Sequence, residues 1–509
     1  MKKKYVLFSI VIVVLLVTFV TCFNYFKTTN NYVEDNVNNQ TKITKGISMN
    51  LEQTAGAGDY KTVTQSSWPT EGYKFNTELS RCENGSELSW DDTNKKVIVS
   101  GNMSDKCYVY FDKVLVLSEV CNDKTLKDCI IAQYTGTQGQ NNIYYHNSSL
   151  SNGAGDNSYR YAGGDYQLTS KAISAGFNTV AAKAQTSTDG VVNYYCNGIK
   201  QYVGAGCPTT YIAYYSLQYD TTNTQYQSYK EALEKAIVDG YLIEDIVKNF
   251  VCFGTNESTC STDNLYRIIG VIDGKVKLIL SDGATTDMLG TDGGYVTPYS
   301  ESGWTSSNYK GDGDLSKIGT YHWNTSGKNI WSSSTTNTTN LNTNYINNIG
   351  TKWKAMIDDT IWYVGGMVLD NGINTNVKTA YSYEIGANKD ASTTVTTKIG
   401  MMYLSEYYYG ATPYYWTFPG NNTNKNDYRK SINDNWMHIG LDEWTISRDS
   451  LYTNLTFAVS SSGNIGHDFV SSGVGGDIGE VIRPVFCLKS SVQYSSGTGT
   501  STDPIRIKL

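Results

Sequence analysis

This chain has little proline, little charge and little histidine. Of its 509 residues, 7 are Pro, 4 are His and 17% are charged, whereas a soluble chain usually has about a quarter of its residues charged. Any catalytic or metal site that uses histidine would have to be built from His146, His322, His438 or His467. The net charge of −7 excludes nucleic acid and anionic lipid as main partners, because both are bound through a basic surface.

Motifs of several cofactor-binding classes are also missing. The chain has no P-loop, and the glycines of 473–479 miss the dinucleotide pattern because Ile478 occupies the third glycine position. There is no Cys-x2-Cys pair, so a zinc site is not supported. No repeat with a fixed period of 20–50 residues indicates a solenoid or a propeller. The sequence therefore predicts no cofactor.

Only one long apolar run is present. Residues 5–23 carry no charge and follow Lys2, Lys3 and Lys4. As a helix this run is roughly 28 Å long, close to the thickness of the hydrocarbon core of a membrane. The lysines favour a cytoplasmic N-terminus, with the rest of the chain outside the cell. We expect a single-pass membrane anchor, followed by a flexible Asn/Thr/Lys-rich stalk at residues 24–47.

Two other fates of this run stay open. A signal peptidase would have only a Val-x-Cys site at residues 20–22, and a lipid on Cys22 would follow Thr21 and Phe19, which fit a lipoprotein signal poorly. The length of the run favours an uncleaved anchor over either kind of processing.

The ten cysteines give a separate indication of the compartment. Eight of them form local couples: Cys82 with Cys107, Cys121 with Cys129, Cys196 with Cys207, and Cys252 with Cys260. Short disulfide loops are typical of exported chains, although sequence alone does not fix connectivity, so the pairing of neighbours is a prediction. Cys487 lies in an apolar stretch and is predicted to be a buried strand residue, because no nearby group would lower its pKa.

Composition predicts a multidomain, mainly β chain with α+β parts. Aromatic residues make up 13% and include 41 Tyr, and there are 47 Gly, which is typical of many short strands and turns. We expect a small disulfide-stapled β-sandwich at residues 48–115 and a disulfide-bearing connector with short helices at residues 116–260. Helices in the connector are predicted at 124–131, around 229–237 and at 242–250. Residues 261–509 form a large, aromatic-rich α+β domain.

The large domain has the clearest local signals. Two apolar runs, 266–272 and 275–280, flank Asp273-Gly274, which predicts a hairpin with a type I′ turn. An i,i+4 ridge predicts one helix over 341–356. Further strands are predicted at 361–364, 455–459, 465–470 and 481–489.

Four stretches of this domain, Ile399–Tyr407, Glu443–Arg448, Phe457–Ile465 and Ile482–Lys489, match the motifs of one family. They resemble an uncharacterised domain of surface proteins from Gram-positive-type bacteria, which ends in V-R-P-V-x-x-L-K. The family is distantly similar to the C-type-lectin-like fold of formylglycine-generating enzymes. Thr445, Ile446 and the lack of a Pro after Arg448 depart from its pattern. The formylglycine-type dithiol has no counterpart here, because Cys487 is alone in the second half of the domain.

Residues that carry catalytic or metal chemistry are few, and we predict no catalytic residue and no metal site. His467 shares the parity of a strand and is predicted to be a hydrogen-bonded core residue, while His322 and His438 have aromatic neighbours. Asp442 and Glu443 are adjacent on a strand, so their carboxylates point to opposite faces. Acidic residues in Asp-Gly turns complete no calcium loop: Asp282, Asp292, Asp312 and Asp314.

Aromatic residues supply the remaining functional signal. Eight of the ten Trp lie between Trp304 and Trp444, which is more than a core of this size requires. Indole and phenol rings with polar edges are typical of binding faces. The predicted face for a glycan or protein ligand consists of Trp323, Tyr408, Tyr415, Trp416, Trp436 and Trp444.

Three functions follow from these features. The first is a membrane-anchored surface protein that binds a ligand or mediates adhesion through residues 261–509. The second is an extracytoplasmic hydrolase of cell-wall glycan or peptide, which needs two convergent carboxylates or a histidine beside a nucleophile. Its check is whether His322, His438 or His467 lies within hydrogen-bond reach of Asp, Glu, Ser or Cys487. The third is a structural envelope component without a ligand. The first is the one we expect.

Overall fold

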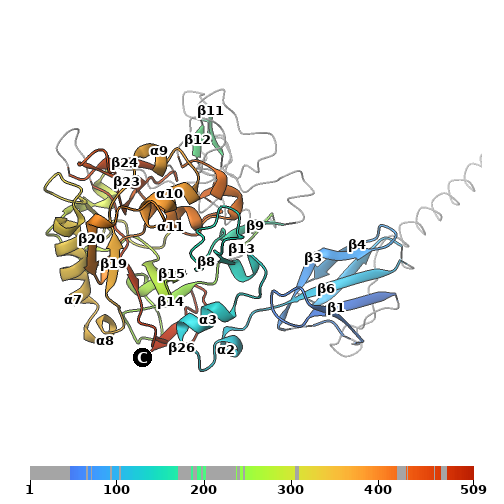
Figure 1. The fold of residues 1–509 in the computed structure, drawn as a ribbon. Coiled ribbons are helices and arrows are strands. Elements are labelled where there is room, and N and C mark those ends of the chain that lie inside the picture. The colour runs from blue at the N-terminus through green and yellow to red at the C-terminus, as the bar shows by residue number, and fades with distance from the viewer. Residues whose placement is uncertain are drawn as a thin grey trace, which may run out of the picture. The chain divides into compact units, whose positions relative to one another are not determined.

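A computed structural model describes most of the chain after residue 45 (Figure 1). The described residues are 46–64, 67–69, 71–91, 94–102, 105–169, 185–186, 192–196, 199–201, 237, 241–244, 247–303, 309–420, 431–432, 434–463, 465–471 and 479–509. The expected anchor and nearly all of the stalk lie outside them, as does most of the helix expected at 229–237. No helix in the described part of the chain is long and apolar enough to cross a membrane. The chain divides into two compact units between Leu115 and Val116.

Unit 1 is a small β domain. Its strands are β1 (Ile47–Glu52), β2 (Tyr60–Val63), β3 (Tyr73–Cys82), β4 (Glu87–Asp91), β5 (Lys96–Ser100) and β6 (Cys107–Lys113). Four of them form a sheet in the order β2-β1-β6-β3, with β1 parallel to β6, and β4 and β5 form a hairpin. The hairpin covers the sheet because Trp90 packs on Phe75 and Phe111, with ring centroids 6.2 and 5.3 Å apart.

Unit 2 contains a seven-stranded antiparallel sheet. Its strands are β7 (Ile143–Tyr145), β8 (Tyr159–Tyr161), β14 (Phe250–Cys252), β15 (Leu265–Ile272), β16 (Lys275–Leu280), β21 (Ile399–Gly400) and β25 (Val485–Cys487). The order is β21-β25-β16-β15-β8-β7, and β14 also pairs with β15. The hairpin predicted from Asp273-Gly274 is confirmed, and both turn residues have positive φ, 50° and 71°, as a type I′ turn requires.

This sheet crosses the boundary expected between residues 260 and 261. β7, β8 and β14 come from the predicted connector but pair with strands of the predicted large domain. The described part of 116–260 is therefore part of the same compact unit as residues 261–509. The helix predicted at 242–250 is wrong: β13 (Leu242–Glu244) pairs with β9 (Tyr166–Leu168), and Phe250 begins β14. A short apolar run fits a strand as well as a helix. Residues 242–244 and 250–252 are strands because β9 and β15 pair with them.

Short helices lie at one end of the central sheet. Helix α2 (Leu117–Val120) precedes α3 (Leu126–Ala132), which corresponds to the helix predicted at 124–131. The side chain of Thr125 caps α3 by accepting the N–H of Asp128. Nearby is the C-terminal hairpin of β26 (Gln493–Ser496) and β27 (Arg506–Lys508).

Three of the four predicted disulfides are confirmed. They are Cys82–Cys107 in unit 1, and Cys121–Cys129 and Cys252–Cys260 in unit 2. The fourth prediction, a disulfide between Cys196 and Cys207, is not confirmed. Cys207 lies outside the described residues, so this pairing stays a prediction.

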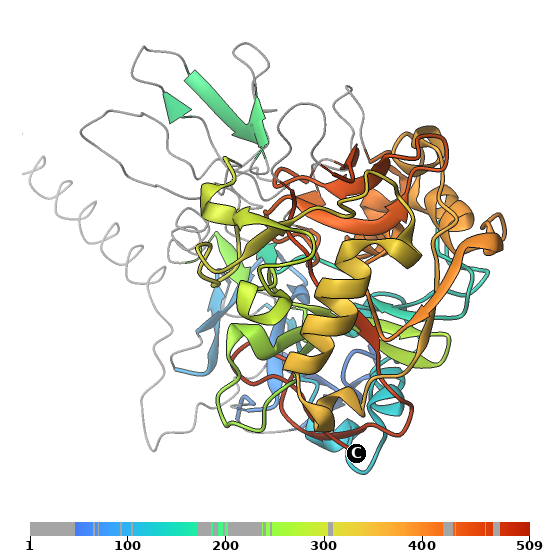
Figure 2. The ribbon, with the colours of Figure 1, turned by 90° about the vertical axis from the view of Figure 1, so that its left-hand side faces the viewer.

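The helix predicted over 341–356 is instead three consecutive pieces. A π-helix, η5 (Thr336–Tyr345), continues into α7 (Ile346–Asn348), and α8 (Thr351–Lys354) follows Gly350. The break falls at Gly350, whose φ of 80° is outside the helical region. Figure 2 shows this gold run along one side of unit 2. The apolar ridge still faces the core, since Leu341, Tyr345, Trp353 and Met356 are buried.

Asparagine side chains fasten η5 to the loops beside it. Asn340 Nδ2 donates to the carbonyl oxygens of Leu289 and Asp292 at 2.9 and 3.1 Å. Asn342 Nδ2 reaches the carbonyl of Ile399 at 2.9 Å. Amide side chains here satisfy backbone carbonyls that would otherwise be buried without a donor. This explains how a segment with almost no charge and few apolar residues packs in the interior.

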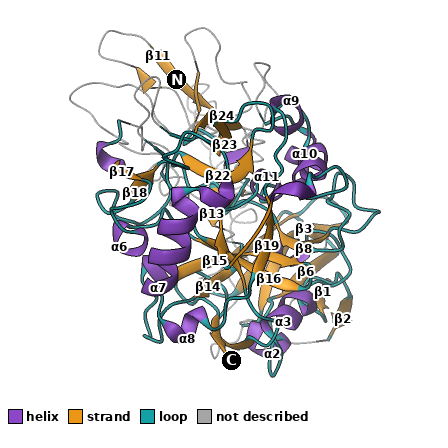
Figure 3. Cartoon of the chain, turned by 60° about the vertical axis from the view of Figure 1, so that its left-hand side comes forward, coloured by secondary structure: helices purple, strands orange, loops and turns teal. Residues whose placement is uncertain are grey.

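A second small sheet and several helices lie at the other end of unit 2, with the seven-stranded sheet between (Figures 1 and 3). The sheet consists of β22 (Glu443–Arg448), β23 (Leu455–Val459) and β24 (Ile465–Phe469), and the helices are α9 (Leu369–Gly372), α10 (Val377–Glu384) and α11 (Leu404–Tyr409). The predicted strand 455–459 is confirmed as β23. The strand predicted at 481–489 is shorter, because only Val485–Cys487 is regular.

The remaining elements are short. Paired strands are β10 (Gln185–Thr186), β11 (Val192–Cys196), β12 (Ile199–Gln201), β17 (Tyr295–Pro298) with β18 (Gly319–Tyr321), and β19 (Thr360–Tyr363) with β20 (Thr394–Thr397). Single helical turns are η1 (Gln140–Asn142), η2 (Thr262–Asn264), α6 (Thr286–Leu289), η3 (Tyr299–Glu301), η4 (Trp331–Ser333), η6 (Ala391–Thr393) and η7 (Pro413–Thr417). Short strands and turns dominate, as the composition predicts.

Candidate functional site

The six aromatic residues predicted to form a binding face are all buried. Their exposed fractions are 7% or less: Trp323, Tyr408, Tyr415, Trp416, Trp436 and Trp444. Each indole N–H among them donates to a backbone carbonyl, as Trp444 does to Tyr321 at 2.7 Å and Trp323 to Thr445 at 3.0 Å. The prediction of an aromatic ligand face at these positions is wrong. These rings are core, because each polar edge finds an acceptor inside the protein, a carbonyl for the indoles and Tyr408 and the Asp434 carboxylate for Tyr415.

The surroundings of the histidines test the prediction of a hydrolase. His438 Nδ1 lies 3.0 Å from the hydroxyl of Tyr407, and burial holds the pKa of His438 well below its ordinary value. His467 Nδ1 lies 3.4 Å from Asp449 Oδ2, so this histidine is hydrogen-bonded as predicted, but its side chain is 28% exposed and the prediction of a core position is wrong. An Asp–His pair orients a base, but a hydrolase of the predicted kind also needs a nucleophile beside it. Cys487, the candidate thiol, is buried in β25, where burial raises its pKa.

The adjacent carboxylates Asp442 and Glu443 diverge, as predicted. Glu443 forms a bidentate ion pair with Arg483, with N–O distances of 2.7 and 2.8 Å. Asp442 instead accepts hydrogen bonds from the hydroxyl of Tyr299 and the N–H of Ser461, at 3.1 and 3.0 Å. The two groups therefore serve different partners and do not form a glycosidase pair.

Asp282, one of the calcium candidates, organises a turn. Its carboxylate accepts the hydroxyl of Tyr309 at 2.5 Å and the N–H groups of Gly283 and Gly313 at 2.7 and 3.0 Å. In the described ranges there is no group of three or more His, Cys, Asp or Glu that could hold a metal ion.

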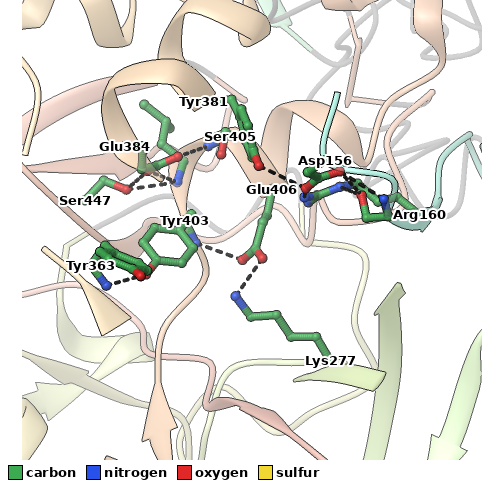
Figure 4. Close-up of polar contacts among 12 residues, drawn as sticks. Asp156, Arg160, Lys277, Tyr363, Tyr381, Glu384, Tyr403, Ser405, Glu406 and Ser447 are labelled. Atoms are coloured by element: carbon green, nitrogen blue, oxygen red, sulfur yellow. Dashed lines mark hydrogen bonds and ion pairs between the residues drawn. The ribbon is translucent and has the colours of Figure 1, made fainter. Parts of the chain in front are cut away.

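The densest polar network surrounds the N-terminus of α11 (Figure 4). Glu384, from α10, accepts the N–H groups of Leu404 and Ser405 at 2.8 and 2.9 Å and the hydroxyl of Ser447. A carboxylate at this position satisfies amides that have no partner within the helix. Glu384 is nevertheless only 3% exposed, and burial raises its pKa to about 7.

Glu406 and Lys277 form a second part of the network. Lys277 Nζ, from β16, lies 2.6 Å from Glu406 Oε1, and both side chains are buried. The other carboxylate oxygen of Glu406 accepts the N–H of Tyr403 at 3.0 Å. The ammonium also lies over the rings of Trp362 and Tyr403, 4.9 and 4.7 Å from their centroids. Ion pairing and ring contacts together replace the water that Lys277 loses.

A third part joins β8 to α10. Arg160 Nη2 pairs with Asp156 at 2.8 Å, and the hydroxyl of Tyr381 donates to the same Asp156 oxygen at 2.9 Å. The Arg160 guanidinium holds the pKa of Asp156 well below its usual range, against the opposing effect of burial. Most of these polar groups bond to one another, and the contacts link elements far apart in the sequence. The network therefore stabilises the fold.

One exposed feature of unit 2 is the turn between β22 and β23. It presents large apolar side chains to solvent: Leu451 is 64% exposed and Tyr452 is 50% exposed. Ile330 (48%) and Phe469 (36%) lie on adjacent segments. Asn329 N–H bonds to the carbonyl of Thr453 at 2.7 Å, and Phe469 pairs with Leu455 in the sheet. We call Ile330, Leu451, Tyr452 and Phe469 the apolar patch.

The turn is held rigidly from below. Asn329, which is buried, donates from Nδ2 to the carbonyls of Asp449, Tyr452 and Leu455 at 2.7, 2.9 and 2.7 Å. Asp449 Oδ1 accepts the N–H groups of Leu451 and Tyr452 at 2.8 and 3.1 Å. Its other oxygen faces His467, whose ring lies 6.4 Å from that of Tyr452. These contacts hold Leu451 and Tyr452 in an outward position.

Comparison with protein-family models, with curated proteins and with solved structures finds no match for this chain. The site therefore rests on its own geometry.

Sequence reasoning missed both the network and the patch. A signal for the network was present, because Lys277 interrupts an otherwise apolar strand and a buried lysine needs a partner. A signal for the patch was Leu451-Tyr452 inside a polar turn sequence, Asp449-Ser to Thr-Asn454, where large apolar residues are unusual.

Proposed function

We propose that this chain is an extracytoplasmic surface protein that binds another protein through the apolar patch. The observation that carries the proposal is the rigid turn that holds Leu451 and Tyr452 in solvent. Nothing in folding favours the exposure of two such side chains, and a pre-organised apolar anchor is what protein interfaces use at their centres.

The cysteines support an extracytoplasmic location. Three disulfides, Cys82–Cys107, Cys121–Cys129 and Cys252–Cys260, are formed between sequence neighbours. Such bonds form and persist in oxidising compartments and are rare in the cytosol. The apolar run at residues 5–23 would serve as the membrane anchor. The resemblance to surface proteins of Gram-positive-type bacteria, with their distantly C-type-lectin-like layout, agrees with this location.

The chemistry of the patch favours a protein over a glycan or a lipid. Two of its four members, Ile330 and Leu451, are aliphatic and offer a sugar neither a stacking ring nor a hydrogen bond, so only Tyr452 and Phe469 could stack on one. An anionic lipid surface would need basic residues beside the patch, and the whole chain has a net charge of −7. The four half-exposed side chains present on the order of 300 Å², the size of an interface centre.

The experiment is a binding screen with the full chain. Labelled protein is applied to a panel of purified extracellular proteins and, in parallel, to a glycan array. We expect protein ligands whose binding falls at least about tenfold in the double variant Leu451→Ser/Tyr452→Ser, about 1.4 kcal/mol or more. The control is Ile361→Ser, which removes a side chain 56% exposed outside the patch.

Three results would contradict the proposal. They are binding to glycans alone, protein binding that the double variant retains, and protein binding that Ile361→Ser lowers equally. Sedimentation velocity of the same chain tests the structural alternative, because self-association abolished by the double variant would make the patch an assembly contact.

A further inference from the structure

A second surface of unit 2 is hollowed where the loop closed by Cys252–Cys260 meets the C-terminal hairpin of β26 and β27. The hollow has a volume of about 480 Å³, inside the range of about 300–1,000 Å³ that small-molecule sites occupy. Figures 1 and 3 place the C-terminal residue at one end of unit 2 and β24, which carries Phe469, near the other. The hollow is therefore distinct from the apolar patch and does not depend on the function proposed for it.

Cross-links hold two walls of the hollow in one geometry. Arg506, from β27, donates from Nη1 to the carbonyl of Glu257 at 2.7 Å and from Nη2 to the carbonyl of Ser258 at 2.5 Å. At the root of the loop the N–H of Cys252 donates to the carbonyl of Ile505 at 2.9 Å. Together with the Cys252–Cys260 disulfide, these bonds fix the loop against the hairpin. A pre-organised wall costs a ligand less ordering entropy on binding.

The base of the hollow is apolar. Trp353, Pro504 and Ile507 line it and are buried. Lys352 lies over the Trp353 ring at 4.9 Å, and its ammonium donates to Asn256 Oδ1 at 2.7 Å. This contact joins α8, which carries Lys352 and Trp353, to the disulfide loop.

The rim of the hollow is rich in hydroxyl groups and carries two carboxylates. The hydroxyls belong to Thr255, Ser258, Ser495, Ser496 and Thr502, and the carboxylates to Glu257 and Asp503. Hydroxyl groups both donate and accept hydrogen bonds, whereas ionised carboxylates only accept. A purely apolar ligand would leave these groups without partners. A phosphate or another polyanion would meet two carboxylates, Glu257 and Asp503, against one guanidinium, Arg506, whose Nη1 and Nη2 already donate to carbonyls.

We propose that this hollow binds a saccharide of one or two rings. A sugar matches the polar rim, because its hydroxyl groups donate to carboxylates and exchange hydrogen bonds with Ser and Thr. The carboxylates add a preference for sugars that carry an ammonium group.

The test uses the full chain and three named probes: glucose, N-acetylglucosamine and glucosamine. Ligand-observed NMR and calorimetric titration give each dissociation constant. We expect at least one sugar to bind with a Kd below about 10 mM. Glu257→Gln and Asp503→Asn keep the shape of the rim but remove one charge each, and we expect each to weaken binding about fivefold or more. Both side chains are at the surface, so the variants should keep the wild-type melting temperature.

Matched controls separate this site from the rest of the molecule. Glu301→Gln removes an exposed carboxylate outside the hollow, and we expect it to leave the Kd unchanged. Leu451→Ser/Tyr452→Ser, which tests the apolar patch, should also leave saccharide binding unchanged. A preference for glucosamine that disappears in Asp503→Asn would show that a carboxylate pairs with the ammonium. The proposal is overturned if none of the three sugars binds, or if binding survives both carboxylate substitutions.

Discussion

Glu384 makes the stability of unit 2 depend on pH. Its pKa is raised by burial from an ordinary value of 4.5 to about 7. Between these values the unfolded chain has the carboxylate and the folded chain has the carboxylic acid, so the folded state binds more protons. The proton that Glu384 binds in the folded state therefore adds to the free energy of unfolding. This contribution is complete below pH 4.5 and is lost as the pH rises toward 7. At about 1.4 kcal/mol per pH unit, the loss is about 3 kcal/mol.

The assay compares wild type with Glu384→Gln in urea at pH 5, 6, 7 and 8. Tryptophan fluorescence reports mainly on unit 2, since eight of the ten Trp lie between Trp304 and Trp444. The variant lacks the titration and loses part of the cap, because an amide has one acceptor oxygen for the N–H groups of Leu404 and Ser405. That loss is constant with pH. The stability advantage of wild type should therefore shrink by about 3 kcal/mol from pH 5 to pH 8.

Three hydrogen-bond donors oppose the effect of burial on the pKa of Glu384, because they favour its ionised form. They are the N–H groups of Leu404 and Ser405 and the hydroxyl of Ser447. If the difference between wild type and variant stays constant or grows with pH, the three donors outweigh burial and Glu384 is ionised in the folded protein. Glu301→Gln, at an exposed carboxylate, should show no pH-dependent difference and serves as the control.

Three further outcomes follow from the described contacts. Trp444→Ala should lower the free energy of unfolding by about 3–5 kcal/mol, seen in urea melts, and should not act as a binding-specific variant, because this indole is core. Lys277→Met should cost about 3–5 kcal/mol by leaving Glu406 charged and unpaired, and adding Glu406→Leu should restore most of that loss in the same assay. Replacing Cys252 and Cys260 with Ser should cost about 2.5 kcal/mol, with a matching fall in melting temperature that reducing agent reproduces in wild type.

Local signals in the sequence predicted local structure well. Asp273-Gly274 specified its own turn because few residue pairs adopt positive φ twice, and the flanking apolar runs then had only one way to pair. Three cysteine couples paired as neighbours, since short loops close most easily. The same reasoning stays untested for Cys196 and Cys207, because Cys207 is not among the described residues. These predictions depend on residues that are close in the chain.

Long-range consequences were beyond the sequence. The run at 242–250 is apolar enough for a helix or a strand, and β9 and β15 decided between them. The boundary expected at residue 260 was wrong because a composition shift does not show that β8 and β14 pair with β15.

The prediction of an aromatic binding face was wrong for a related reason. A count of tryptophans does not reveal which rings find a carbonyl for the indole N–H, as Trp444 does with Tyr321. Burial of an aromatic ring depends on that partner, which comes from more than a hundred residues away. The exposed apolar patch consists of ordinary residues, and only the turn held by Asn329 makes them unusual.

The position of β25 also constrains how the chain matures. This strand lies between β21 and β16, yet it is made about 340 residues after β7, which is at the far edge of the same sheet. β16 ends at Leu280 and β25 begins at Val485, so at a synthesis rate of about 5–20 residues per second the edge of β16 stays unpaired for roughly 10–40 s. Unit 1, complete by residue 113, can fold during that interval. A chaperone that shields nascent strands should therefore recognise the middle of this polypeptide rather than its beginning.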